Sequence, residues 1–343
     1  MATNNHPKQI LITGASGFIG GFLVDEALRR GYQVWAGIRP SSDRSHLQDP
    51  RIRFIDLPYS DAAKLSDVIA NHVREEGPWD FVIHNAGLTK TTDKRLFFEV
   101  NAENTRRFLD ALAPATHRPK KFLLMSSLSS FGIGDEHGFA PFRLDDTQRP
   151  NTAYGQSKLL AEQYVRRQED FPYIILRPTG VYGPGERDYY VEIKAVQSGW
   201  DLKAGFTPQR ITFIYVKDLA RAAFLCLEHE ELRNKEYFVA DGDVHTDGSF
   251  ARLVQELLDK KHVVHARLPL GLVYGACIAC ETIGRMLHRG FLFNTDKYLI
   301  LKQRNWICDT VPLCRDTGFR AEYDLRRGLT EAITWYREHG WLH

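Results

Sequence analysis

Ile10-Leu11-Ile12-Thr13-Gly14-Ala15-Ser16-Gly17-Phe18-Ile19-Gly20 is the stretch that decides the fold. Its apolar start predicts a short buried strand, and the three glycines predict a tight turn. An amphipathic pattern over residues 22–30 predicts a helix after the turn, and a second apolar strand is predicted over 33–38. Strand, turn, helix and strand in this order form the βαβ unit of a doubly wound α/β sheet.

The same alternation continues through the first half of the chain. Strands are predicted over 53–55, 81–83, 121–125 and 173–177, with helices over 63–76, 98–113 and around residue 154. Near-continuous apolar strands indicate a parallel sheet that is buried on both faces.

The pattern changes after Pro178. It predicts a helix and loop over 189–209, a strand over 211–216, a helix over 218–229, a strand over 235–240 and a terminal helix over 326–339. We therefore expect residues 8–178 and about 211–242 to form one domain. Residues 179–210 and 243–343 would form a smaller, mostly helical lobe, interleaved with it.

The glycine turn has the spacing of a dinucleotide-binding site. Gly14 permits the tight bend, Gly17 lets a pyrophosphate approach the backbone, and Gly20 lets the helix pack close to the sheet. The start of the helix then offers N–H groups and a positive dipole end to the phosphates. The whole turn, with Ser16, Phe18 and Ile19, is the predicted cofactor site.

The end of the second strand bears on the choice of cofactor. NAD sites often carry an acid there to bind the ribose 2′-hydroxyl, whereas this chain has Arg39 and no acid. A guanidinium suits a 2′-phosphate, which favours NADP(H) and leaves NAD as the alternative. A solvated surface arginine is the competing interpretation. Asp56 and Leu57, after the third strand, are placed to border the adenine; an ordinary exposed loop acid is the alternative for Asp56.

Polar groups suited to proton transfer follow the later strands. Ser126 and Ser127 come directly after the strand over 121–125, at the sheet edge where ligands bind. Tyr154 and Lys158 share one face of a helix, and a nearby ammonium lowers the pKa of a phenol. Such a phenol exchanges a proton while hydride moves to or from a nicotinamide.

Small residues follow the strand over 81–83 in a similar way. Asn85, Ala86 and Gly87 are expected to pass close to the cofactor ribose. Asn101, on the next helix, either holds that turn or is an ordinary helix residue.

Together these motifs resemble an extended short-chain dehydrogenase/reductase of the NAD-dependent epimerase/dehydratase family. The similar segments are 13–20, 84–87, 125–127, 154–158 and 177–185. The resemblance implies a Rossmann-type fold with Ser127, Tyr154 and Lys158 as the catalytic residues. It also implies that Lys158 binds the nicotinamide ribose, that Pro178 and Val181 line the nicotinamide pocket, and that homodimers form through helices over 98–113 and 157–167.

Three features bear on the branch of the family. Leu128 and Ser129 stand where 4,6-dehydratases carry an acidic pair, which disfavours dehydration. Gly37-Ile38-Arg39 is similar to the strand end of dihydroflavonol and cinnamoyl-CoA reductases, which use NADPH. The apolar run over 268–280, with Phe291-Leu292-Phe293, is similar to the substrate lobe of 3β-hydroxysteroid dehydrogenases. A core helix and a membrane-resting surface are the other interpretations of that run.

Arg210 favours a sugar-nucleotide substrate instead, because sugar-nucleotide enzymes of the family place a phosphate-binding Arg in a similar segment. The prediction is a reductase or dehydrogenase acting between a secondary alcohol and a ketone on a largely apolar ring substrate, hydroxysteroid or dihydroflavonol-like. The alternatives are a nucleotide-sugar 4-epimerase with tightly bound NAD and a non-catalytic nucleotide-sensing protein.

Composition excludes other classes of partner and site. A formal net charge of +2 gives no reason to expect a nucleic-acid partner. Five scattered cysteines predict reduced thiols, and Cys277 and Cys280 are read as helix cysteines rather than metal ligands. The N-terminus has no apolar signal segment, and charges interrupt the run over 268–287, so a soluble cytoplasmic protein is expected.

Overall fold

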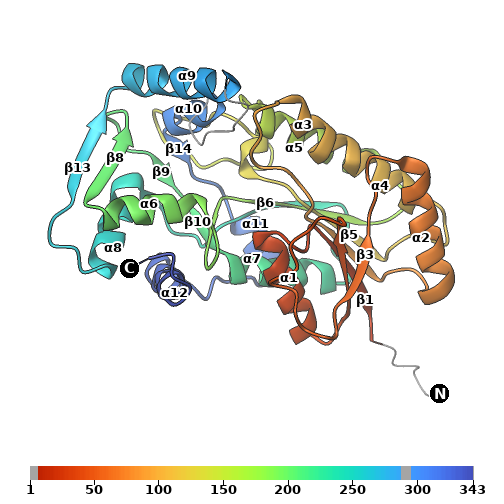
Figure 1. Ribbon diagram of the computed structural model, residues 1–343. Helices are drawn as coiled ribbons and strands as arrows, with labels where there is room; N and C mark the ends of the chain where they lie inside the picture. Colours follow the sequence, from red (N-terminus) through yellow and green to blue (C-terminus); the bar gives the residue numbers. More distant parts are fainter. Residues whose placement is uncertain (1–6, 287–294, 343) are drawn as a thin grey trace.

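The computed structural model describes residues 7–286 and 295–342. Its centre is a sheet of seven parallel strands in the order β11-β6-β5-β4-β1-β2-β3 (Figure 1). The strands are β1 (Gln9–Thr13), β2 (Gln33–Ile38), β3 (Arg53–Asp56), β4 (Phe81–His84), β5 (Lys121–Met125), β6 (Tyr173–Pro178) and β11 (Lys235–Val239). This order reverses direction next to β1, which confirms the predicted doubly wound sheet.

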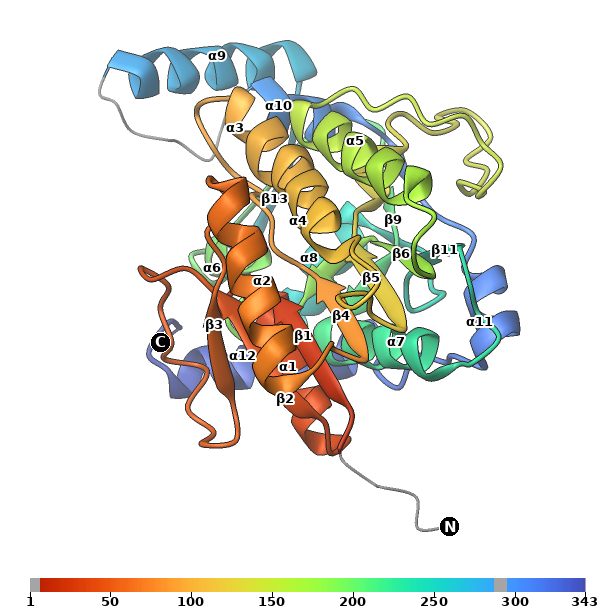
Figure 2. The same ribbon diagram turned by 90° about the vertical axis from the view of Figure 1, so that its right-hand side faces the viewer.

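Helices cover both faces of the sheet because alternate residues of its strands point to opposite sides. On β1, Ile10 and Ile12 pack toward α1 (Phe18–Arg29), α7 (Val216–Glu228) and α11 (Val311–Thr317). Leu11 packs toward α2 (Ala62–Glu76), α4 (Asn104–Leu112) and α5 (Ala153–Arg167) on the other face (Figure 2). Both faces are therefore buried, as the continuous apolar strands predicted.

The part of the chain after β6, apart from α7, β11 and α11, mixes helices with short strands. Its elements are β7 (Gly180–Tyr182), α6 (Asp188–Gln197), β8 (Trp200–Ala204), β9 (Arg210–Ile211), β10 (Phe213–Tyr215), β12 (His245–Thr246), α8 (Asp247–Leu257), β13 (Val264–Leu268), α9 (Leu270–Met286), α10 (Thr295–Lys302), β14 (Asn305–Trp306) and α12 (Leu325–Glu338). Tyr182, Phe213, Phe250 and Leu329 share its buried core.

Two local predictions for this part of the chain were wrong. The segment over 189–209 contains the strand β8, and the single strand predicted over 211–216 is the two short strands β9 and β10. Neither belongs to the main sheet, because β10 pairs with β7, and β9 pairs with β12 and β14.

Two helices also differ from prediction: the one that follows the glycine turn and the one predicted over 98–113. Helix α1 begins at Phe18, directly after Gly17, and not at residue 22. The helix predicted over 98–113 is three pieces: α3 (Arg95–Phe97), the π-helix η1 (Phe98–Glu103) and α4. A π-turn inside a helix frequently marks a functional site, because the extra residue redirects side chains.

The described residues hold five free cysteines, of which Cys226, Cys277 and Cys308 are buried; Cys280, on α9 with Cys277, is half-buried. No helix in the described ranges is long and apolar enough to cross a membrane. Phe291, Leu292 and Phe293 lie outside the described residues.

Candidate active site

The glycine turn leaves no room for side chains. Gly14 has a φ of +65°, and a Cβ there would lie 2.8 Å from the Cα of Ala86. A Cβ on Gly20 would lie 2.1 Å from the carbonyl oxygen of Gly14. Gly17 is the N-cap of helix α1, and no side chain caps the first N–H groups of the helix, so these groups remain available to a phosphate. The turn therefore fits the pyrophosphate of a dinucleotide.

A buried hydrogen-bond chain joins the turn to the next strand. The N–H groups of Asn85 and Ala86 donate to Thr13 Oγ1 over 3.2 and 3.1 Å, so the Thr13 hydroxyl donates to His84 Nδ1 over 2.9 Å. The proton of His84 is then on Nε2 and faces Thr105 Oγ1 at 3.0 Å. Thr105 in turn donates to the Asn101 carbonyl over 2.7 Å.

Burial, which has the larger effect, and the nearby Lys158 cation together lower the pKa of His84 to about 3. The neutral imidazole thus joins β4 to β1 through Thr13 and to α4 through Thr105, and so fixes the position of these elements relative to one another. Sequence reasoning gave His84 no role. The available signal was a polar ring directly after a buried strand, beside the threonine that ends the neighbouring strand.

Asn101 connects the loop after β4 to the helix α5. Its Oδ1 accepts from Leu88 N at 2.6 Å, and its Nδ2 donates to Leu88 O at 3.0 Å and to Ser157 Oγ at 2.9 Å. The π-turn of η1 carries Asn101, which is buried. A Cβ on Gly87 would lie 3.2 Å from Lys158 Nζ, so this loop passes directly over the lysine.

Helix α5 is fixed at its N-terminus by two caps. The hydroxyl of Thr152 accepts from Gly155 N at 3.0 Å, and Asp296 of α10 accepts from Ala153 N at 3.1 Å. A Cβ on Gly155 would lie 2.3 Å from the Ser129 carbonyl oxygen. Glycine at this position therefore lets the first turn of α5 lie against the 3-10 helix η2 (Leu128–Ser130), next to Ser127.

The structure brings Ser127 and Tyr154 together, and Lys158 follows Tyr154 by four residues, about one turn, on α5. A hydrogen bond between Ser127 and Tyr154 lowers the pKa of the phenol, but burial has the larger effect and raises that pKa overall. The raised direction is opposite to the one expected from the lysine alone. Lys158 Nζ donates to the Met125 carbonyl over 2.9 Å, and burial lowers the pKa of this ammonium to about 8.

A buried group of charges lies under these residues. The Ser126 hydroxyl donates to Glu162, whose carboxylate also accepts from Arg177 Nε at 3.0 Å and from Arg177 Nη2 at 2.8 Å. Arg177 lowers the pKa of Glu162 against the effect of burial, so the carboxylate stays charged. The hydroxyl of Ser126 is therefore occupied, and Ser127 is the serine that is hydrogen-bonded to Tyr154.

The remaining predicted residues lie along the carboxyl edge of the sheet. Arg39 is exposed at the end of β2, and among the described residues its guanidinium forms no ion pair. Arg44 instead lies 4.7 Å from the ring centre of Phe54. The other predicted cofactor residues range from exposed to buried: Asp56 (exposed), Leu57 and Pro178 (buried), Ser16, Phe18, Ile19 and Val181 (half-buried).

A model of the NAD dependent epimerase/dehydratase family matches residues 10–240. The chain belongs to this family. The match spans the glycine turn, both serines, Tyr154, Lys158 and the last strand of the main sheet. Members of the family are NAD-dependent, so the protein is an enzyme of the extended short-chain dehydrogenase/reductase type.

Similar proteins within the family are named for different substrates, some for nucleotide sugars and others for apolar compounds. UDP-glucose 4-epimerase of Vibrio cholerae is 28% identical over 74% of this chain and 77% of its own. Ceramide reductase of Caulobacter vibrioides is 24% identical over 97% and 96%, and 3-beta-hydroxysteroid dehydrogenase of Mycolicibacterium neoaurum is 26% identical over 96% and 92%. A solved UDP-glucose 4-epimerase of Thermotoga maritima shares the fold, with a TM-score of 0.76 at 20% identity over 96% of this chain and 99% of its own.

Proposed function

We propose that this protein is an NADP(H)-preferring oxidoreductase that interconverts a secondary alcohol and a ketone on an apolar, lipid-like substrate such as a hydroxysteroid. The observation that carries the proposal is the hydrogen-bonded pair of Ser127 and Tyr154 beside the buried Lys158. These three groups suffice to hold a carbonyl oxygen and to move one proton to or from it.

The residues divide the work as follows. A bound nicotinamide supplies the hydride in the reductive direction and accepts it in the oxidative direction. Tyr154 donates its phenolic proton to the substrate oxygen during reduction, while the Ser127 hydroxyl holds that oxygen by a hydrogen bond. The ammonium of Lys158 stabilises the phenolate that Tyr154 becomes, and a proton from solvent restores the phenol.

The preference for NADP(H) rests on Arg39. It is exposed at the end of β2, the position from which a side chain reaches the adenosine ribose. Its backbone is fixed by two hydrogen bonds with Ser42, from Arg39 N to Ser42 Oγ at 3.0 Å and from Ser42 N to Arg39 O at 2.9 Å. An unpaired guanidinium on a fixed backbone is suited to a 2′-phosphate.

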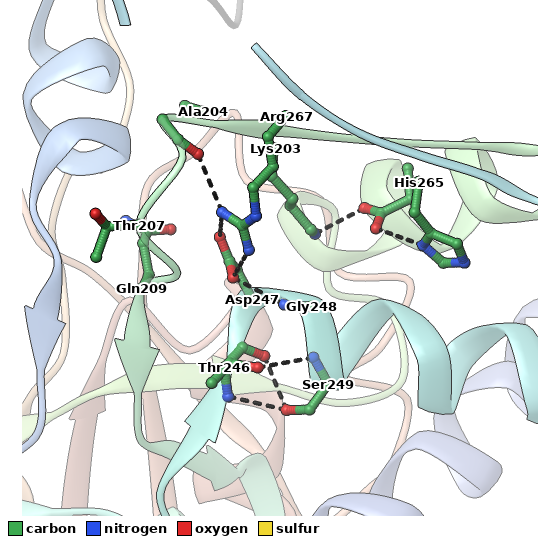
Figure 3. A network of polar contacts seen from close by, with 12 residues as sticks. Lys203, Ala204, Thr207, Gln209, Thr246, Asp247, Gly248, Ser249, His265 and Arg267 are labelled. Atoms are coloured by element: carbon green, nitrogen blue, oxygen red, sulfur yellow. Dashed lines mark hydrogen bonds and ion pairs between the residues drawn. The ribbon is translucent and has the colours of Figure 1, made fainter. Parts of the chain in front are cut away.

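The charges of the second lobe favour an apolar substrate over a sugar diphosphate. Arg267 is paired with Asp247 at 2.7 Å, and Lys203 with Asp201 at 3.0 Å (Figure 3). Arg304 donates to backbone carbonyls, among them those of Ala204 and Thr207 at 2.9 and 2.7 Å. These cations are already neutralised or hydrogen-bonded inside the lobe, so a diphosphate would have to break those contacts.

Two of the relatives that align with nearly the whole chain are named for apolar compounds, a ceramide and a 3-beta-hydroxysteroid. The proposal includes the division of the chain into a cofactor domain (8–178 and about 211–242) and a substrate lobe (179–210 and 243–343). Homodimerisation through the helices over 98–113 and 157–167 stays a prediction.

A nucleotide-sugar 4-epimerase is the second candidate, favoured by Arg210 and by the relative from Vibrio cholerae. Arg210 is exposed, with its guanidinium 4.5 Å from the ring centre of Phe139, so it remains accessible to a phosphate. The non-catalytic alternative is disfavoured because both the Tyr and the Lys of the site are in place.

The test begins with the purified protein as it is isolated. The protein is denatured, any released dinucleotide is identified by chromatography, and NADPH and NADH are titrated into a native sample. We expect little retained nucleotide, tighter binding of NADPH, and turnover of a ketosteroid or a keto derivative of ceramide. Stoichiometric retained NAD together with turnover of UDP-glucose would establish the epimerase instead.

A further inference from the structure

Helix α9 exposes an apolar face to solvent. Leu272, Tyr274, Ile278 and Ile283 are between 41 and 60% exposed, while Val273 and Cys277 pack inward. Between residues 270 and 283 the only charged residue is Glu281, and its carboxylate accepts from Thr295 N at the start of α10. A surface helix ordinarily turns its charges outward. This helix has no charge on its outer side over these residues, and it lies at one edge of the molecule (Figure 1).

The strand pair next to α9, formed by β8 and β13, also turns apolar side chains toward solvent. On β8 and β13, Trp200, Leu202 and Val264 are between 52 and 54% exposed. Trp200 pairs with Val264, so these two side chains lie together on the outer face of the two-stranded β8–β13 ribbon. The apolar residues of the pair therefore face solvent.

The charged residues of the same two strands face the lobe instead. Asp201 accepts from Lys203 at 3.0 Å and contacts His265 Nδ1 at 2.9 Å, and Arg267 binds Asp247 of α8 (Figure 3). Inward charges and outward apolar groups reverse the usual arrangement of a half-exposed sheet. The two strands pair their charges inside the lobe and leave Trp200, Leu202 and Val264 more than half exposed.

The two apolar faces meet where β13 runs into α9. Leu268 ends β13 and Leu270 begins α9. A Cβ on Gly205, just past β8, would lie 3.3 Å from Leu270, so the next residue, Phe206, is close to the start of α9 and is 70% exposed. We call the exposed set the apolar face: Trp200, Leu202, Phe206, Val264, Leu272, Tyr274, Ile278 and Ile283.

We propose that the apolar face rests on a lipid bilayer. A specific protein partner would be met by hydrogen-bonding groups, at about one per 100–200 Å² of interface. The outer side of α9 offers Leu, Ile, Ala, Gly, Tyr and Thr, which suit a fluid apolar phase. Exposed Trp, Tyr and Phe side chains are typical of residues that enter the bilayer interface. Lys260 and Lys261, both exposed just before β13, add positive charge at one end, which favours anionic headgroups.

One consequence rests on the proposed function. Tyr274 lines a cavity of about 570 Å³ together with Ala153, Gln156 and Tyr298. Ala153 is the neighbour of Tyr154 and begins the catalytic helix α5. An apolar substrate leaving the bilayer at α9 would therefore arrive beside the first turn of that helix.

Vesicle flotation tests the surface without reference to activity. The full-length protein is mixed with phosphatidylcholine vesicles, with or without anionic phosphatidylglycerol, and the bound fraction is measured. We expect the protein to float with the vesicles, more strongly when they are anionic. Leu272→Glu/Ile278→Glu should reduce the partition coefficient roughly tenfold or more, because two charges would have to enter the interface. Val311→Glu is the matched control, since Val311 is 65% exposed on α11, far from α9 (Figure 2), and should bind as the parent does.

Circular dichroism and thermal unfolding serve to check that both variants are folded, which we expect for substitutions of exposed side chains. Equal flotation of the parent and the double variant would overturn the proposal. So would a parent protein that fails to float but forms a dimer that the double variant breaks, because the face would then belong to a second copy of the chain. Neither result depends on which substrate the enzyme uses.

Discussion

Burial of the Lys158 ammonium in the candidate active site should lower the free energy of unfolding, and replacing the lysine by an apolar residue should raise it again in part. Lys158 is 6% exposed, and burial lowers the pKa of its ammonium from 10.5 to about 8. A shift of this size corresponds to a cost of about 3 kcal/mol for keeping the ammonium charged well below pH 8. We predict that Lys158→Met abolishes turnover yet unfolds at a similar or higher urea concentration at pH 7.

The loss of one contact opposes the gain. Lys158 donates to the Met125 carbonyl, and methionine leaves that acceptor without its donor, at a cost of ~1–3 kcal/mol. The net change at pH 7 is thus an increase of at most about 2 kcal/mol. Comparing stability at pH 7 and pH 9 isolates the effect of the buried ammonium better, because the lost hydrogen bond changes the free energy of unfolding equally at the two pH values.

The sign follows from proton binding. The pKa of the folded state is the lower one, so between about pH 8 and 10.5 the unfolded chain binds more protons and the stability conferred at this site rises with pH. From pH 7 to pH 9 the parent should gain about 1 kcal/mol relative to Lys158→Met.

Urea unfolding at pH 7 and pH 9 measures this difference directly. Lys120→Met is the control, because the Lys120 side chain is 72% exposed, and it should follow the parent. If the parent and Lys158→Met respond identically to pH, the ammonium is not buried as the structure has it, and the reasoning fails.

Three further predictions concern the site. Tyr154→Phe removes only the phenolic hydroxyl group, so turnover should fall by ~100-fold or more while NADPH affinity, measured by calorimetry, stays within about threefold; near-parental turnover would contradict the mechanism. Arg39→Asp should weaken NADPH by ~10-fold or more and NADH by far less in fluorescence titrations, whereas Arg44→Asp, the control, should affect both little; equal losses would make Arg39 an ordinary surface residue. Gly155→Ala should lower the free energy of unfolding by ~1–3 kcal/mol, because its Cβ would lie 2.3 Å from the Ser129 carbonyl oxygen; urea unfolding with parental stability would show that η2 moves freely away from α5.

Much of the main sheet could be predicted from local patterns. The strands over 33–38 and 121–125 have the bounds expected from their apolar runs, because a parallel strand buried on both faces leaves an uninterrupted signal. The short strands of the second lobe left no such signal. β8 alternates Trp, Asp, Leu and Lys, but its apolar side faces solvent and its charged side faces the lobe. Its environment is set by partners outside the strand, Glu192 of α6, which pairs with Lys203, and His265 of β13, which pairs with Asp201.

The site shows the same division. The spacing of Tyr154 and Lys158 on a helix was readable, since four residues make about one turn. The direction of the pKa shift of Tyr154 was not, because burial, which only the folded chain creates, outweighs the hydrogen bond with Ser127. Likewise, the sequence offers Ser126 and Ser127 as neighbours, and only the position of Glu162 shows which hydroxyl is already occupied.

By itself, then, the order of the residues determined the βαβ alternation, the glycine turn and the Tyr–Lys pair, because each depends on neighbours within about one helical turn or one strand. Tertiary structure alone decided the protonation of His84, the role of Asn101 and the outward apolar face of α9. Each of these depends on contacts, or on their absence, between segments far apart in the chain. Burial and hydrogen-bond partners of that kind exist only once the sheet and the second lobe have come together.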